Sequence, residues 1–180
     1  ALLMMRTLTT LRAEAARKQG QKGHLERVME RTNRKLALNN ERLLFASLFI
    51  GLLDTRDGSF RYANAGHLRP VLLRRGDAPV LLKVPRNPIA GIDPTIDYAL
   101  GETRLGSGDQ LLLYTDGVTE AFDAGNRAFG VDRLLMALDP GRDPRATCES
   151  LVAAVHAFAA DAPQSDDITV LAVRYDAEAP

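Results

Sequence analysis

The chain has 180 residues, of which 46% are hydrophobic and 26% charged, a composition typical of one ordinary globular domain with a buried core. Basic and acidic residues balance to a formal net charge of zero, so we expect neither nucleic acid nor an anionic membrane as a partner. No apolar run approaches the roughly 18 residues of a membrane span, and the single cysteine, Cys148, excludes an internal disulfide and indicates a reducing, cytoplasmic compartment.

Residues 1–40 predict a pair of helices. Apolar residues recur with a helical period over residues 2–19 and again over residues 25–36, with glycines between the two stretches. The sequence opens at Ala1, already inside the first helical pattern. We therefore expect that residues upstream of this chain are missing.

Residues 41–180 predict an antiparallel β-meander with C-terminal helices. The turn Asp54–Gly58 lies between two apolar runs and indicates a hairpin, whose first strand is interpreted as buried. The predicted strands are 44–53, 60–65, 71–74, 80–84, 97–105, 110–115 and 168–175. The predicted helices are 131–138 and 144–159, the second with Asp143 as its N-cap. This order lacks βαβα alternation and predicts a layered α+β fold.

Two acidic sites lie where apolar strands end or begin. Asp116 directly follows the predicted strand 110–115, while Asp166 and Asp167 directly precede the predicted strand 168–175. If these strands are antiparallel neighbours, Asp116 and Asp166 converge. Two close carboxylates favour a hard divalent cation, and ligation by oxygen alone indicates Mg²⁺ or Mn²⁺. Asp-Gly is also a common turn dipeptide, so position alone leaves a plain turn or cap open as their role.

Four motifs resemble those of the PPM-type metal-dependent serine/threonine phosphatases related to the stage II sporulation phosphatase. The longest is Leu111–Ala121, with the sequence LLLYTDGVTEA. Tyr62–His67 (YANAGH) is similar to the family's Asn-Ala-Gly-His turn, and Asp166–Val170 (DDITV) to its closing motif. Gly108–Leu112 (GDQLL) matches a strand entry. The motifs occur in the family's order and cover about residues 43–175.

The resemblance implies a four-layer αββα sandwich of two antiparallel sheets flanked by helix pairs. It also implies a binuclear Mn²⁺ or Mg²⁺ centre, whose activated water attacks phosphoserine or phosphothreonine without a further catalytic residue. Residue by residue, it makes Asp116 and Asp166 metal ligands. Gly117 and Asp167 would then support these ligands from the adjacent positions.

The Asn-Ala-Gly-His motif is interpreted as a structural turn built on Asn64, Gly66 and His67. A general acid role for His67 is the alternative. Because His67 sits in a tight turn shortly before Pro70, we favour structural hydrogen bonding.

The sequence departs from the resembled family at its start. The family's other metal ligands come from an N-terminal Gly-Asp-x-x-Asp strand and an Asp-x-x-Gly-His-Gly turn, and neither motif occurs in this sequence. We therefore expect residues 1–180 to be a single phosphatase domain that is truncated at its N-terminus.

The resemblance implies a bacterial enzyme whose substrate is a phosphorylated regulatory protein, such as an anti-sigma-factor antagonist. It also implies a sensor or receiver domain upstream and a homodimer. A haloacid-dehalogenase-like phosphatase is disfavoured, because Tyr114 stands where its nucleophilic aspartate would be. A catalytically incomplete module used for binding or dimerisation stays open: the missing motifs favour it, while the intact Asp116 and Asp166 oppose it.

Overall fold

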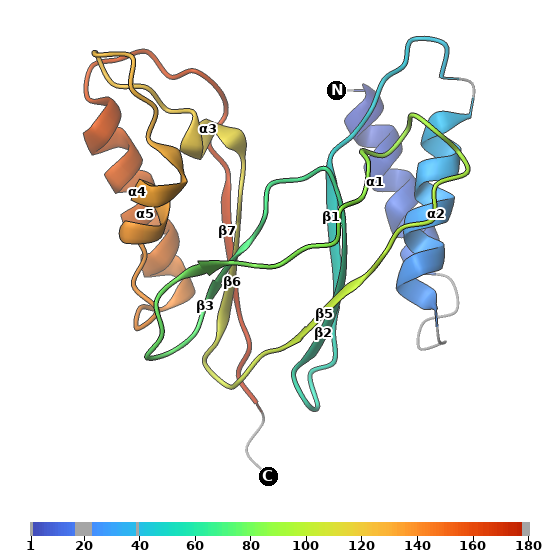
Figure 1. Ribbon diagram of the computed structural model, residues 1–180, viewed down its shortest axis with the longest axis horizontal. Coiled ribbons are helices and arrows are strands. Elements are labelled where there is room, and N and C mark those ends of the chain that lie inside the picture. Colours follow the sequence, from blue (N-terminus) through green and yellow to red (C-terminus); the bar gives the residue numbers. More distant parts are fainter. Residues whose placement is uncertain (1, 17–22, 39, 178–180) are drawn as a thin grey trace. The chain divides into compact units, whose positions relative to one another are not determined.

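The computed structural model describes residues 2–16, 23–38 and 40–177, and the chain divides into two compact units (Figure 1). The first unit comprises Ala1–Asp54, Ser59–His67 and Lys83–Arg104. The second comprises Thr55–Gly58, Leu68–Leu82 and Leu105–Pro180. Each unit holds one antiparallel sheet with helices packed against it. The predicted α+β class with two antiparallel sheets is confirmed.

The first unit is a three-stranded sheet with two helices. Its elements are α1 (Leu2–Ala15), α2 (His24–Ala37), β1 (Leu48–Leu53), β2 (Ser59–Ala65) and β5 (Gly101–Arg104). The strand order is β1-β2-β5, and the β1–β2 hairpin runs from Leu48 opposite Ala65 to Leu53 opposite Phe60. Two helices thus stand where the helix pair was predicted, while residues 17–19 of the first predicted helix lie outside the described residues.

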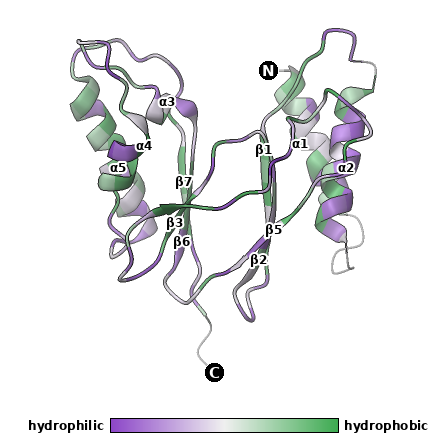
Figure 2. Cartoon of the chain, in the orientation of Figure 1, coloured by the Kyte–Doolittle hydropathy of each residue, from purple (hydrophilic) through white to green (hydrophobic). Residues whose placement is uncertain are grey.

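Helix α2 attaches the helix pair to this sheet, since its apolar face packs on β2. Its buried Met29 and Leu36 join Ala63 and Ala65 in one core cluster. Figure 2 shows hydrophilic and hydrophobic residues alternating along α2, as an amphipathic helix requires. On its other side α2 holds α1 through charge, because Lys35 lies 2.7 Å from the buried carboxylate of Glu14.

The second unit is a four-stranded sheet in the order β4-β3-β6-β7. Its elements are β3 (Val71–Leu73), β4 (Val80–Leu81), β6 (Gln110–Tyr114), α3 (Asp116–Thr119), α4 (Gly130–Met136), α5 (Pro144–Ala159) and β7 (Val170–Arg174). Strand β6 is almost entirely buried, as predicted. It pairs with β7 from Gln110 opposite Arg174 to Tyr114 opposite Val170. Buried residues of β3, β6, α3, α4 and α5 form one core, which includes Leu73, Leu112, Val118, Leu134 and Leu151.

Two predictions for the strands were wrong. Strand β1 begins at Leu48 instead of Leu44 and is only partly buried. The apolar residues before it form a turn, because the Asn40 side chain accepts a hydrogen bond from Leu44 N and donates one to Leu44 O. The strands also do not follow one continuous meander, since β3 and β4 lie in the second sheet and β5 returns to the first.

None of the helices in the described residues is both long and apolar enough to cross a membrane.

Candidate metal-binding site

The candidate site begins where the buried strand β6 ends, at Thr115. This residue has extended backbone angles, φ −90° and ψ 162°, and is the N-cap of the short helix α3. Its hydroxyl does not cap the helix; it donates to Asp167 O at 2.7 Å and accepts from Thr169 N at 2.9 Å. Its amide also donates to Thr169 O at 3.1 Å. Thr115 therefore ties the end of β6 to the segment that leads into β7.

Gly117 lets the same two segments approach each other closely, because it has no side chain. A Cβ atom on this residue would lie 2.5 Å from Asp167 O and 3.0 Å from Asp166 O. Both neighbours are backbone atoms, which cannot rotate away as a side-chain tip can. Gly117 therefore allows a close approach between the two backbone segments.

The two candidate ligands thus belong to adjoining backbone segments, as the antiparallel pairing of β6 and β7 predicted. Asp116 is exposed at the start of α3, and one of its oxygens accepts from Gly117 N at 3.1 Å. Asp166 is also exposed, and one of its oxygens accepts from Asp167 N at 2.7 Å. Within residues 2–16, 23–38 and 40–177, neither carboxylate forms a salt bridge with an arginine or lysine.

These two carboxylates have the chemistry that a hard divalent cation prefers, but two are too few to complete its coordination. Exposed oxygen ligands without a cationic partner are what Mg²⁺ and Mn²⁺ prefer, whereas each ion takes about six ligands. The part of the chain that the structure describes brings no three His, Cys, Asp or Glu side chains together in a group that could hold a metal. The described residues therefore hold no complete metal site, and Asp116 and Asp166 stay candidate ligands.

The Asn-Ala-Gly-His motif forms a closed turn at the end of β2, within the first unit. The buried side chain of Asn64 donates to His67 O at 2.9 Å and accepts from His67 N at 2.8 Å. Gly66 has φ 70°, and a Cβ there would meet the side chain of Ile89 at 2.3 Å. The turn is thus pinned by Asn64 and requires glycine at position 66.

Sequence reasoning missed three residues that hold this end of the second unit. It placed Thr115 in a strand, although a threonine before a helical turn is a common N-cap and would have signalled α3. Ser165 donates to Glu120 O at 2.6 Å, and Gln164 donates to Asp166 O at 2.7 Å. No local sequence pattern predicts the contact of Ser165, because it joins residues 45 positions apart.

Comparison with known proteins identifies the family. The family model described as stage II sporulation protein E (SpoIIE) matches residues 1–176. The chain belongs to the SpoIIE family. Its similarity to curated proteins is partial: protein IcfG of Synechocystis is 30% identical over 131 residues, which cover 72% of this chain and 20% of that protein. The phosphoserine phosphatase RsbU of Bacillus subtilis is 28% identical over 97 residues, covering 54% and 29%.

Solved structures show the same fold. The SiaA-PP2C domain of Pseudomonas aeruginosa matches 98% of this chain and 70% of its own length, with a TM-score of 0.81 and 24% identity. The phosphatase domain of SpoIIE from Bacillus subtilis, presoaked with Mn, matches 97% of this chain and 75% of its own length, with a TM-score of 0.60 and 20% identity. This SpoIIE-family chain therefore spans less than a third of the curated relatives above and most of each solved domain.

Proposed function

We propose that the polypeptide containing this chain is a metal-dependent phosphatase that hydrolyses phosphoserine or phosphothreonine on a regulatory protein. The observation that carries the proposal is the junction of Asp116 with Asp166. Thr115 and Gly117 hold their backbones together, and both carboxylates lack a cationic partner among the described residues. Membership of the SpoIIE family supports the reaction class.

In this proposal Asp116 and Asp166 hold Mn²⁺ or Mg²⁺, in a binuclear centre that other residues of the polypeptide complete. A bound divalent ion supplies positive charge that stabilises the phosphoryl oxygens and activates water for attack on phosphorus. The chain's own residues supply position. Thr115 joins the two backbone segments that carry the carboxylates, and Gly117 keeps the space between these segments small.

The names of two relatives support a proposal for the substrate class. RsbU is named a phosphoserine phosphatase, and one of the solved structures contains RsbU and RsbW domains in one mycobacterial protein. We infer that the substrate is a serine-phosphorylated regulator of the anti-sigma-factor antagonist type, in a bacterial cytoplasm. A sensor or receiver domain upstream and a homodimeric state belong to the same proposal.

The experiment that tests this function is phosphate release from such a phosphoprotein by the intact polypeptide. Treatment with EDTA should abolish release, and addition of Mn²⁺ or Mg²⁺ should restore it. Residues 1–180 alone should release almost none, because two carboxylates are too few to hold two ions that each take about six oxygens. Full activity in EDTA would contradict the proposal. Absence of release with either metal would favour the alternative of an incomplete module used for binding or dimerisation.

A further inference from the structure

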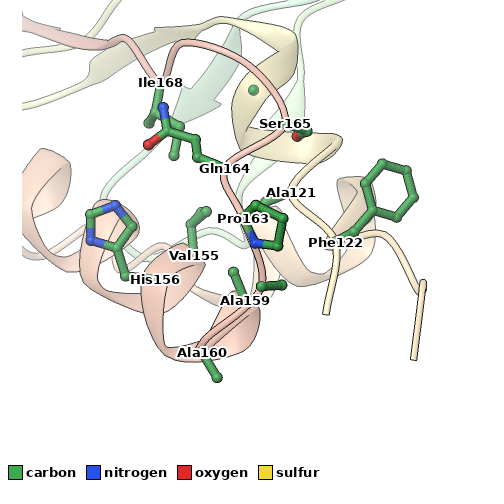
Figure 3. A pocket seen from close by; sticks show the side chains of 12 residues that line it. Ala121, Phe122, Val155, His156, Ala159, Ala160, Pro163, Gln164, Ser165 and Ile168 are labelled. Atoms are coloured by element: carbon green, nitrogen blue, oxygen red, sulfur yellow. The ribbon is translucent and has the colours of Figure 1, made fainter. Parts of the chain in front are cut away.

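A small cavity lies directly behind the candidate metal-binding end of the second unit. Its volume is about 150 Å³, and twelve residues line it (Figure 3). Gly117 and Ser165 are among them, and they are the chain neighbours of the candidate ligands Asp116 and Asp166 respectively. The cavity is therefore lined by the same two backbone segments that carry the candidate metal ligands.

Nine of the twelve residues that line the cavity are apolar or glycine, and the other three are His156, Gln164 and Ser165. Figure 3 shows the end of α5, with Val155 and Ala159, on one side and the loop that carries Pro163 on another. Small residues create the space, since four of the lining residues are alanines. An apolar cavity of about 150 Å³ is large enough for a benzene-sized group. An aliphatic side chain such as that of leucine therefore fits it.

Two of the three polar side chains in the wall are engaged within the protein, while the imidazole of His156 forms no hydrogen bond among the described residues. Ser165 donates its hydroxyl hydrogen to Glu120 O at 2.6 Å, and Gln164 donates from its amide to Asp166 O at 2.7 Å. A polar ligand would have to compete with these bonds, whereas an apolar ligand leaves them intact. The lining therefore favours an apolar occupant.

Ala160 shows that the chain around the cavity is held in an unfavourable conformation. It ends α5 with φ 49° and ψ −116°, a combination that favours glycine and costs a side-chain-bearing residue energy. The sharp turn starts the loop that bears Pro163, Gln164 and Asp166.

We propose that this cavity receives an aliphatic side chain of the phosphoprotein substrate, close in sequence to its phosphorylated residue; the inference rests on the proposed function. An extended peptide rises about 3.3 Å per residue. A residue one to three positions from a phosphorylated residue held at Asp116 and Asp166 would thus lie within about 10 Å of it, and the cavity is lined by the chain neighbours of these two aspartates. The cavity then sets sequence preference next to the phosphorylation site.

The test uses the intact polypeptide and alanine-based peptides of eight residues with a central phosphoserine. In each peptide one position, from three before to three after the phosphoserine, is leucine instead of alanine. With Mn²⁺ present, one leucine position should raise kcat/KM about tenfold over the all-alanine peptide. Fluorescence anisotropy with the dephosphorylated peptides in EDTA should show a binding preference for the same position.

The variant Ala159→Leu fills the cavity and should abolish the leucine preference. Its matched control is Ala157→Leu, the same change on an exposed position of α5 that does not line the cavity. Ala162→Val narrows the cavity from the loop side and replaces Ala159→Leu if circular dichroism shows that variant to be unfolded. The control should keep the preference of the natural protein.

Each outcome separates the cavity from the proposed function. Binding preference without any turnover in Mn²⁺ would leave the cavity assignment standing and refute the phosphatase. Turnover without preference at any position would refute the cavity assignment alone. An unchanged preference in Ala159→Leu would also overturn it. If Ala159→Leu changed only the oligomeric state, measured by sedimentation, the cavity assignment would also be overturned. The cavity would then belong to a contact between two copies of the chain.

Discussion

Replacing Gly117 by alanine tests the junction of the two candidate ligands. The added Cβ would lie 2.5 Å from Asp167 O, whereas ordinary contact begins at 3.4 Å, so the backbones must separate by about 0.9 Å. Overpacking of this kind costs about 1–3 kcal/mol, and alanine recovers about 1 kcal/mol in a helix. We expect a net loss of up to about 2 kcal/mol, which lowers the midpoint of thermal unfolding by up to about 8 °C.

The same displacement should affect turnover more than stability. Misplacement of a reacting group by about 1 Å can cost on the order of 100-fold in rate. The assay compares unfolding and Mn²⁺-supported phosphate release in the intact polypeptide. Gly106→Ala is the control, because the nearest atom to its added Cβ lies at 3.6 Å, on the side chain of Asp109. If Gly117→Ala behaves like Gly106→Ala in both measurements, the close approach does not matter and the reasoning is refuted.

Three further predictions concern the surrounding structure. Thr115→Val should lose about 0.5–1.5 kcal/mol in urea unfolding, because the exposed hydrogen bonds of its hydroxyl to Asp167 O and Thr169 N are lost, while Thr115→Ser should stay near the natural protein. Ala160→Gly should stabilise the fold by about 1 kcal/mol in the same assay, because it relieves the backbone strain, whereas Ala157→Gly within α5 should destabilise it. Burial, and then the negative charge of Asp93, raise the pKa of Tyr98 to about 12. Its stabilising contribution is therefore complete below about pH 10 and lost as the pH rises towards 12, so the unfolding free energy should fall less steeply there in Tyr98→Phe.

Elements with strong local signals could be predicted from the sequence. The helix from Pro144 to Ala159 carries its own start signal, and the structure confirms that Asp143 accepts a hydrogen bond from Ala146 N at 3.0 Å. Strand β6 is a run of apolar residues, and its burial followed from that run. The hairpin of β1 and β2 followed from the turn between two apolar stretches.

Strand ends could not be predicted, because side chains distant in sequence determine them. The strand expected over residues 97–105 is only Gly101–Arg104. Before it, the side chain of Asn87 pairs with both the N–H and the C=O of Ala99, each at 2.9 Å, and so replaces a neighbouring strand. An asparagine twelve residues away gives no periodic signal of this kind.

The sequence indicated which two backbone segments meet at the candidate site, but not the contacts that hold them together. The two apolar strands indicated that Asp116 and Asp166 would converge, and the antiparallel pairing of β6 and β7 bears out that premise. The contacts of Thr115 depend on the tertiary pairing of residues more than 50 positions apart. The cavity depends on how α5 and the following loop meet, which no pattern in the sequence encodes. The roles of Asp116 and Asp166 as metal ligands stay a prediction.

Titration calorimetry with Mn²⁺ on the intact polypeptide tests the central claim most directly. Asp116→Asn removes one proposed ligand, and Asp132→Asn makes the same change at an exposed aspartate of α4. We predict that Asp116→Asn weakens Mn²⁺ binding at least about tenfold and abolishes phosphate release, because a ligand of the activating ion is lost. Asp132→Asn should match the natural protein. Unaltered Mn²⁺ affinity and turnover in a folded Asp116→Asn variant would show that the metal is held elsewhere.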